Sequence, residues 1–206
     1  MTRKTHSIAA SGRLLCGLLA LACGLVPAAC AQNSSTPKAG EPTLNTGASS
    51  GKSTITLTPL IIRQGEHLVE HKLIAAPMPT EERLKNLVAQ KIPIVALLPD
   101  SELKRAGYDA KSVVEKAGGS FTQIAVTADK LGDAKLQKKL FAMLDEALAR
   151  EKSTYIYCAS SDRVGAAIAL HAAKRRGLAA QAALELGRKA GMKTTEAQVK
   201  KILGVK

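Results

Sequence analysis

The segment from Ile92 to Leu98 is a continuous apolar run of strand length, followed directly by Pro99. A strand that is apolar at nearly every position is typical of a sheet covered on both faces, because each side must be shielded from water. Such a sheet needs helices above and below it. The run therefore favours an α/β fold with a mainly parallel sheet.

Helical patterns alternate with other strand-like runs around this segment. Further strands are predicted at 67–74, as an edge strand, and at 121–126 and 154–157. Helices are predicted from Thr80, where Glu81 and Glu82 suit the first turn, and at 109–117, 133–150, 164–176, 179–190 and 195–203. A polar loop is expected at 99–107. This order predicts crossover units around a parallel sheet, followed by C-terminal helices.

The first 58 residues differ in composition from the rest. Basic residues precede an apolar run, Leu14 to Val26, which ends in a small-residue site at Ala29 and Ala31. This layout predicts a signal peptide at 1–31, cleaved after Ala31, and a periplasmic or secreted protein. Residues 32–58 are rich in Ser, Thr, Gly and Pro, which is typical of a flexible linker. Residues 59–206 are then one domain.

The cysteines leave an alternative for the N-terminus. Three of the four, Cys16, Cys23 and Cys30, lie within the predicted signal. A lipoprotein signal, with Cys30 or Cys23 as the acylated residue, would instead anchor the protein to a membrane. With cleavage after Ala31, Cys158 is the single remaining thiol, so no intrachain disulfide is possible. A lone thiol in an oxidising compartment suggests a chemical use, although a buried small apolar residue would look the same.

Cys158 stands between a predicted strand and a predicted helix. The strand would deliver it to the carboxyl edge of the sheet, where open α/β sheets bind ligands. The loop continues through residues whose amides can curl around an anion, and the helix start adds partial positive charge. Arg163 can supply a two-pronged donor to the same anion, and this field should favour the thiolate of Cys158. The predicted anion-binding loop comprises Ala159, Ser160, Ser161, Asp162, Val164 and Gly165.

Three motifs carry a resemblance to a known family. They are the segment 158–166 (Cys-Ala-Ser-Ser-Asp-Arg-Val-Gly-Ala), the segment 185–191 (Glu-Leu-Gly-Arg-Lys-Ala-Gly) and the segment 98–102 (Leu-Pro-Asp-Ser-Glu). From about Leu73 to Met192 the chain resembles the cysteine-dependent phosphatase superfamily. It is most similar to the bacterial beta-lactamase hydrolase-like phosphatase domain family, which is also labelled a sulfur transferase family. The resemblance implies a phosphatase-like α/β fold.

The resemblance also implies a mechanism. Cys158 would attack the phosphorus of a phosphorylated or other anionic substrate, and Arg163 and the loop amides would hold its oxygens. The leaving group would take its proton from an aspartate on the loop after the strand at 121–126. Asp129 is the nearest candidate, although a solvated loop residue would look the same. Asp133 is the next, although it is also placed to cap a helix.

The loop departs from the phosphatase pattern at two places. Tyr157 replaces the histidine that usually precedes the cysteine, and four residues rather than five separate Cys158 from Arg163. That length resembles the active loop of rhodanese sulfurtransferases, whose cysteine carries a persulfide. Leu98 also stands where an arginine is expected before Pro99. Three functions therefore remain open: a phosphatase-like hydrolase, a sulfurtransferase with a Cys158 persulfide, and a non-catalytic anion-binding module.

Other partners are less well supported. The precursor has a net charge of +13, but it contains no Trp, two Phe and three Tyr, and its lysines are scattered. Base stacking would need more aromatic residues, so we expect no nucleic-acid partner. His67 and His71 lack further metal ligands at suitable spacing, so the sequence predicts no metal and no cofactor.

Overall fold

The computed structural model describes residues 60–206. Five strands form one sheet in the order β1-β2-β5-β3-β4. They are β1 (His67–Val69), β2 (Leu73–Ala76), β3 (Ile94–Ala96), β4 (Phe121–Gln123) and β5 (Thr154–Tyr157). Only β1 is antiparallel to its neighbour, and the other three pairings are parallel. The predicted α/β fold with a mainly parallel sheet is confirmed, and β5 keeps its predicted bounds.

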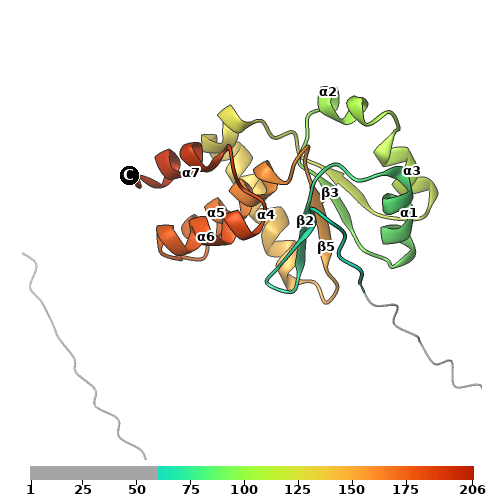
Figure 1. The fold of residues 1–206 in the computed structure, drawn as a ribbon, viewed down its shortest axis with the longest axis horizontal. Helices are drawn as coiled ribbons and strands as arrows, with labels where there is room; N and C mark the ends of the chain where they lie inside the picture. Colours follow the sequence, from blue (N-terminus) through green and yellow to red (C-terminus); the bar gives the residue numbers. More distant parts are fainter. Residues whose placement is uncertain (1–59) are drawn as a thin grey trace, which may run out of the picture. The chain divides into compact units, whose positions relative to one another are not determined.

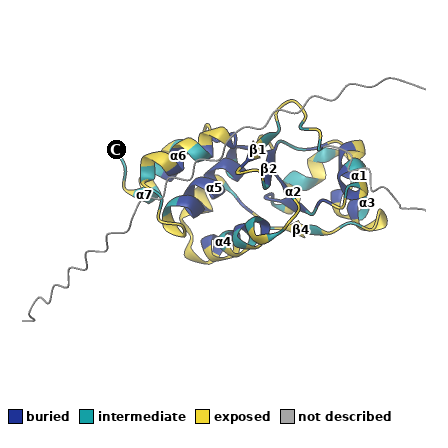
Figure 2. Ribbon diagram, turned by 90° about the horizontal axis from the view of Figure 1, so that it is seen from below, coloured by how far each residue is buried: buried dark blue, intermediate teal, exposed yellow. Residues whose placement is uncertain are grey.

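Helices cover both faces of this sheet. α1 (Glu81–Ala89) and α3 (Ala110–Lys116) lie on one face, and α4 (Ala134–Ala149), α5 (Asp162–Lys174) and α6 (Ala180–Lys189) lie on the other (Figure 1). The shorter α2 (Asp100–Leu103), the two 3-10 helices η1 (Lys104–Ala106) and η2 (Ala128–Gly132), and α7 (Glu196–Leu203) complete the domain. Figure 2 shows that α5 is buried along most of its length, whereas α4, α6 and α7 expose one side. The alanine-rich sequence of α5 suits this central position.

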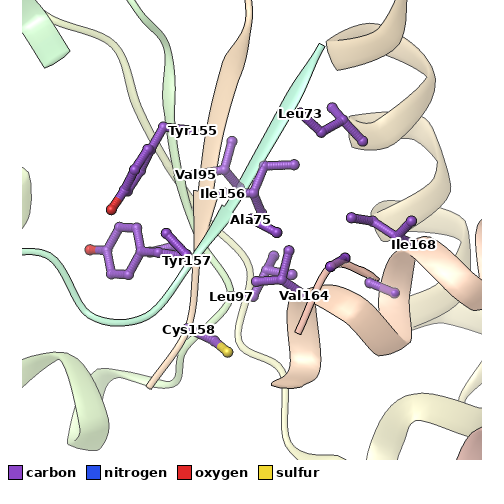
Figure 3. Packing of buried hydrophobic residues seen from close by; sticks show 14 of the residues in the cluster. Leu73, Ala75, Val95, Leu97, Tyr155, Ile156, Tyr157, Cys158, Val164 and Ile168 are labelled. Carbon is purple, nitrogen blue, oxygen red and sulfur yellow. The ribbon is translucent and has the colours of Figure 1, made fainter. Parts of the chain in front are cut away.

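The central strand β5 is buried at every position. Tyr155 and Tyr157 point to one side of it, and Ile156 points to the other, towards Val164 and Ile168 of α5 (Figure 3). Cys158 follows at the carboxyl end of the strand, at the base of the loop that leads into α5. The core therefore fixes the backbone on both sides of the cysteine.

Three local predictions were wrong. The edge strand predicted at 67–74 is a hairpin, because Glu70 and His71 adopt positive φ values of 51° and 58° and turn the chain back. The segment 99–107, predicted to be a polar loop, forms α2 and η1. The helix predicted from Val164 begins two residues earlier, at Asp162. The last two corrections change the surroundings of Arg163.

The predicted signal peptide, its cleavage site, the lipid-anchor cysteines and most of the linker fall outside the described residues. Among residues 60–206, no helix combines the length and the apolar character that a membrane span requires.

Candidate functional site

Cys158 is fully buried, although the next two residues, Ala159 and Ser160, are exposed. Its amide donates a hydrogen bond to the Ala76 carbonyl of β2 at 3.2 Å. The β2-α1 connection also supports the loop, through a 3.4 Å hydrogen bond from the Met78 amide to the Ala159 carbonyl. The loop that begins at Cys158 is therefore tied to the end of β2 and to the residues that follow it.

The start of α5 provides free backbone donors beside Cys158. The first intrahelical hydrogen bond runs from the Gly165 amide to the Ser161 carbonyl at 2.9 Å. The preceding amides, of residues 161–164, have no partner within the helix, as at every helix N-terminus. Ser161 adopts a left-handed conformation, with φ 68° and ψ −16°. A left-handed residue next to helical ones makes a concave set of amides that suits an anion.

The guanidinium of Arg163 donates hydrogen bonds to Glu102 and to a backbone carbonyl, and it keeps one edge for a further partner. The Nη1 and Nη2 groups donate to Oε1 and Oε2 of Glu102, at 2.9 and 2.5 Å, and Nη1 also donates to the Val126 carbonyl at 2.8 Å. Of the five N–H bonds of a guanidinium, this leaves Nε–H and one Nη2–H, which lie on the same edge of the group. Two parallel donors on one edge match two oxygens of a phosphate or sulfate.

Glu102 stabilises the charge and the orientation of this arginine. Its hydrogen bond raises the pKa of Arg163, and the nearby Cys158 side chain raises it further. In turn, the hydrogen bond from Arg163 keeps the pKa of Glu102 below its ordinary value of 4.5. The carboxylate of the pair is therefore charged at neutral pH, and the pairing is lost only as the pH falls through the lowered pKa of Glu102.

Asp162 turns its side chain away from the free amides. Its carboxylate accepts hydrogen bonds from the turn formed by residues 193–195, which follows α6. Burial alone would raise the pKa of Asp162, but these hydrogen bonds outweigh it and lower the pKa. Of the predicted loop residues, Asp162 therefore contributes its backbone amide to the concave face while its side chain binds elsewhere.

The two candidate acids lie on the segment that also supplies the Val126 carbonyl. Asp129 belongs to η2 and is exposed, and the nearby Thr127 side chain lowers its pKa. Asp133 caps α4, accepting from the Leu136 amide at 2.8 Å. Its predicted role as a helix cap is confirmed. Asp129 therefore remains the candidate acid that is free of a capping role.

Sequence reasoning missed Glu102 as a site residue. Glu102 closes the motif 98–102, and with Asp100 it forms the acidic pair after Pro99 that is typical of a helix start, but neither signal assigns it a partner. Its pairing with Arg163 spans 61 positions. A contact between residues so far apart in the sequence produces no periodic pattern from which it could be predicted.

No family model matches the chain, and no curated protein matches it at a significant level. Several solved structures, however, match the chain. Tk-PTP shares 21% identity, with 68% of this chain and 96% of that chain covered and a TM-score of 0.51. PTPMT1 shares 16% identity, with coverages of 68% and 96% and a TM-score of 0.51. A candidate phosphatase from Neisseria meningitidis shares 16% identity, with coverages of 68% and 99% and a TM-score of 0.54. Residues 60–206 therefore have the fold of the cysteine-based phosphatases, as the sequence resemblance predicted.

Proposed function

We propose that this chain is an exported, cysteine-dependent phosphatase-like hydrolase that acts on phosphoesters, either a protein phosphotyrosine or a small phosphate ester. The observation that carries this proposal is the two-donor edge that Arg163 leaves beside Cys158, together with the amides of residues 162–164, which have no partner within α5. These groups present several donors to one tetrahedral anion at the carboxyl edge of the sheet. The fold shared with solved phosphatases supports the same chemistry, but the site decides the function.

The reaction then has two steps. The Cys158 thiolate attacks phosphorus, forming the S–P bond while the P–O bond to the leaving group breaks, and the leaving oxygen takes a proton from Asp129. Arg163 and the loop amides hold the remaining phosphoryl oxygens as charge develops on them. Water next attacks the phosphorus of the phosphocysteine and gives a proton to the Asp129 carboxylate, while the S–P bond breaks to release phosphate and restore the thiolate. Substrate would reach the buried sulfur past the exposed residues Ala159 and Ser160.

Intact mass and phosphate release together test this function. Purified mature protein, wild type and Cys158→Ser, is incubated with an aryl phosphate and, separately, with thiosulfate. Phosphate release by the wild type alone supports hydrolysis. Release that survives in Cys158→Ser, at the wild-type rate, refutes it.

The same experiment distinguishes the two alternatives. The four-residue spacing between Cys158 and Arg163 favours a sulfurtransferase as the second candidate. Its mark would be a mass gain of one sulfur atom on Cys158 after thiosulfate treatment, without phosphate release. Neither change, combined with stabilisation by phosphate, would identify a non-catalytic anion-binding module.

Asp129→Asn should slow hydrolysis of an alkyl phosphate about a hundredfold, because the poor leaving group needs a proton. Hydrolysis of p-nitrophenyl phosphate, whose leaving group is stable as an anion, should change much less. Because the pKa of Asp129 is lowered, the protonated acid is scarce at neutral pH, and the alkyl phosphate rate should rise as the pH falls. Steady-state rates on both substrates across pH check this. An equal loss on both substrates would contradict the acid role.

Export belongs to the same proposal. Processing at Ala31 would release the domain in soluble form, whereas acylation at Cys30 or Cys23 would hold it to a membrane. N-terminal sequencing and mass measurement of protein purified from the producing cell distinguish the two forms. An N-terminus at Met1 would exclude both.

A further inference from the structure

The carboxylate of Asp162 has an unusually complete set of partners. Its Oδ1 accepts from the Lys193 amide at 2.5 Å and from the Thr195 hydroxyl at 3.1 Å, and its Oδ2 accepts from the Thr194 hydroxyl at 2.5 Å. The Thr195 amide lies within 3.3 Å of both oxygens. The same Thr195 hydroxyl lies 3.3 Å from the Asp162 carbonyl oxygen, so its single proton is shared between that oxygen and Oδ1. The turn 193–195 therefore binds both the side chain and the backbone of this residue.

Two further contacts bring the same segment against the loop. Gly191 has φ 93°, and a Cβ built there would lie 2.6 Å from the Cβ of Ser161. A Cβ on Gly165 would lie 2.5 Å from the Met192 amide nitrogen. Residues 191–195 thus pack directly on Ser161, on Asp162 and on the first turn of α5.

An aspartate at this position would otherwise interfere with anion binding. Asp162 is the first residue of α5, next to the unpaired amides, and a carboxylate near a helix N-terminus is attracted to those amides. A side chain that folded back on them would occupy the donors that a phosphate needs and would repel its charge. The donors of the turn 193–195 supply an alternative partner on the opposite side.

We propose that Asp162 is a positioning residue, which fixes the end of the short Cys158–Arg163 loop by binding the turn 193–195 and so keeps the loop amides and Arg163 open to the substrate anion. The C-terminal segment is then part of the active site, although it contributes no group that touches the substrate. This inference rests on the proposed anion-binding function of the loop. It explains how a loop with only four residues between Cys158 and Arg163 keeps a concave shape.

The test compares four variants by two readouts, the affinity for inorganic phosphate by calorimetry and the steady-state kinetics with p-nitrophenyl phosphate. Asp162→Asn keeps the shape of the side chain but offers an NH₂ to donors, so we expect about a tenfold or larger loss of phosphate affinity and of kcat/KM. Thr194 is exposed, so Thr194→Val should fold normally. It removes one hydrogen bond to the carboxylate, and we expect about a threefold loss. Thr194→Ser restores the hydroxyl and should match the wild type.

The matched control is Asp145→Asn. Asp145 also accepts hydrogen bonds at α5, but at the opposite end of that helix: from His171 at 2.9 Å and from Arg175, the residue after its last turn, at 3.1 Å. It should lose thermal stability without losing phosphate affinity. If Asp162→Asn behaves like this control, or binds phosphate more tightly because a negative charge is gone, the positioning role is refuted. Equal affinities of Thr194→Val and Thr194→Ser would refute it even if Asp162→Asn failed to fold.

Direct phosphate binding separates this inference from the proposed function. A wild-type protein that binds phosphate without hydrolysing any aryl phosphate refutes the hydrolase, while the affinities of the variants still decide the role of Asp162. A wild-type protein that binds no phosphate refutes the anion-binding loop and the positioning role together.

Discussion

Replacing Arg163 with lysine should lower kcat/KM for an aryl phosphate about a thousandfold while the domain stays folded. The arginine uses three N–H bonds on Glu102 and the Val126 carbonyl and still presents Nε–H and Nη2–H on one edge. The ammonium group of lysine has three donors in all and cannot present two parallel ones. It would either bind Glu102 or bind the anion. The full positive charge remains, so the loss measures geometry rather than charge.

The control for this prediction is Glu102→Gln. It leaves the whole guanidinium in place but replaces one accepting oxygen of the pair by an NH₂ group, which cannot accept from Arg163. We expect about a tenfold lower kcat/KM, which is much less than for Arg163→Lys. The Glu102 side chain is 24% exposed, so water can replace part of the lost pairing and the domain should stay folded. Steady-state kinetics and thermal melting of both variants check the order. Equal activities of Arg163→Lys and the wild type would show that the two-donor edge does not bind the substrate.

The position of Cys158 could be predicted from sequence because it depends on short-range patterns. Thr154–Tyr157 is apolar enough and short enough to be a buried central strand, and its predicted bounds match β5. The residue after such a strand must lie at the carboxyl edge of a parallel sheet. Cys158 was therefore placed by local sequence and one general rule of α/β topology.

The partners of Arg163 could not be predicted in the same way. The helix that carries it begins at Asp162, because the turn 193–195 takes the Asp162 side chain and Ser161 accepts a left-handed conformation. Propensity disfavours a left-handed serine, and only the surrounding packing stabilises it. Glu102 likewise sits on a helix of four residues, too short to show a period. Both features depend on contacts between residues far apart in the chain.

The hairpin between β1 and β2 was not predicted from the sequence for a related reason. Its turn uses Glu70 and His71 at positive φ, where glycine or asparagine is the usual signal. The sequence offers neither residue there. The turn is instead stabilised by its surroundings, including an ion pair from Arg176 to Glu70 at 2.7 Å.

Gly165→Ala should destabilise the domain by about 3 kcal/mol, although alanine in a helix is ordinarily favoured over glycine by about 1 kcal/mol. A Cβ at this position would lie 2.5 Å from the Gly187 carbonyl oxygen and 2.5 Å from the Met192 amide nitrogen. Both are backbone atoms, so α6 and the segment after it must move away from α5 as a whole. For a domain of this size the loss corresponds to a fall in Tm of about 10 °C.

Gly132→Ala is the matched control, because a Cβ there meets its nearest atom, Cγ1 of Ile202, at an ordinary 3.7 Å. It should leave Tm within about 2 °C of the wild type. The close approach of the Met192 backbone to Gly165 also keeps Met192 and the turn 193–195 in contact with the anion-binding loop. Phosphate should therefore stabilise Gly165→Ala less than it stabilises the wild type or Gly132→Ala, when melting is followed with and without phosphate. A normal phosphate shift in a strongly destabilised Gly165→Ala would mean that the loop keeps its shape without the C-terminal segment.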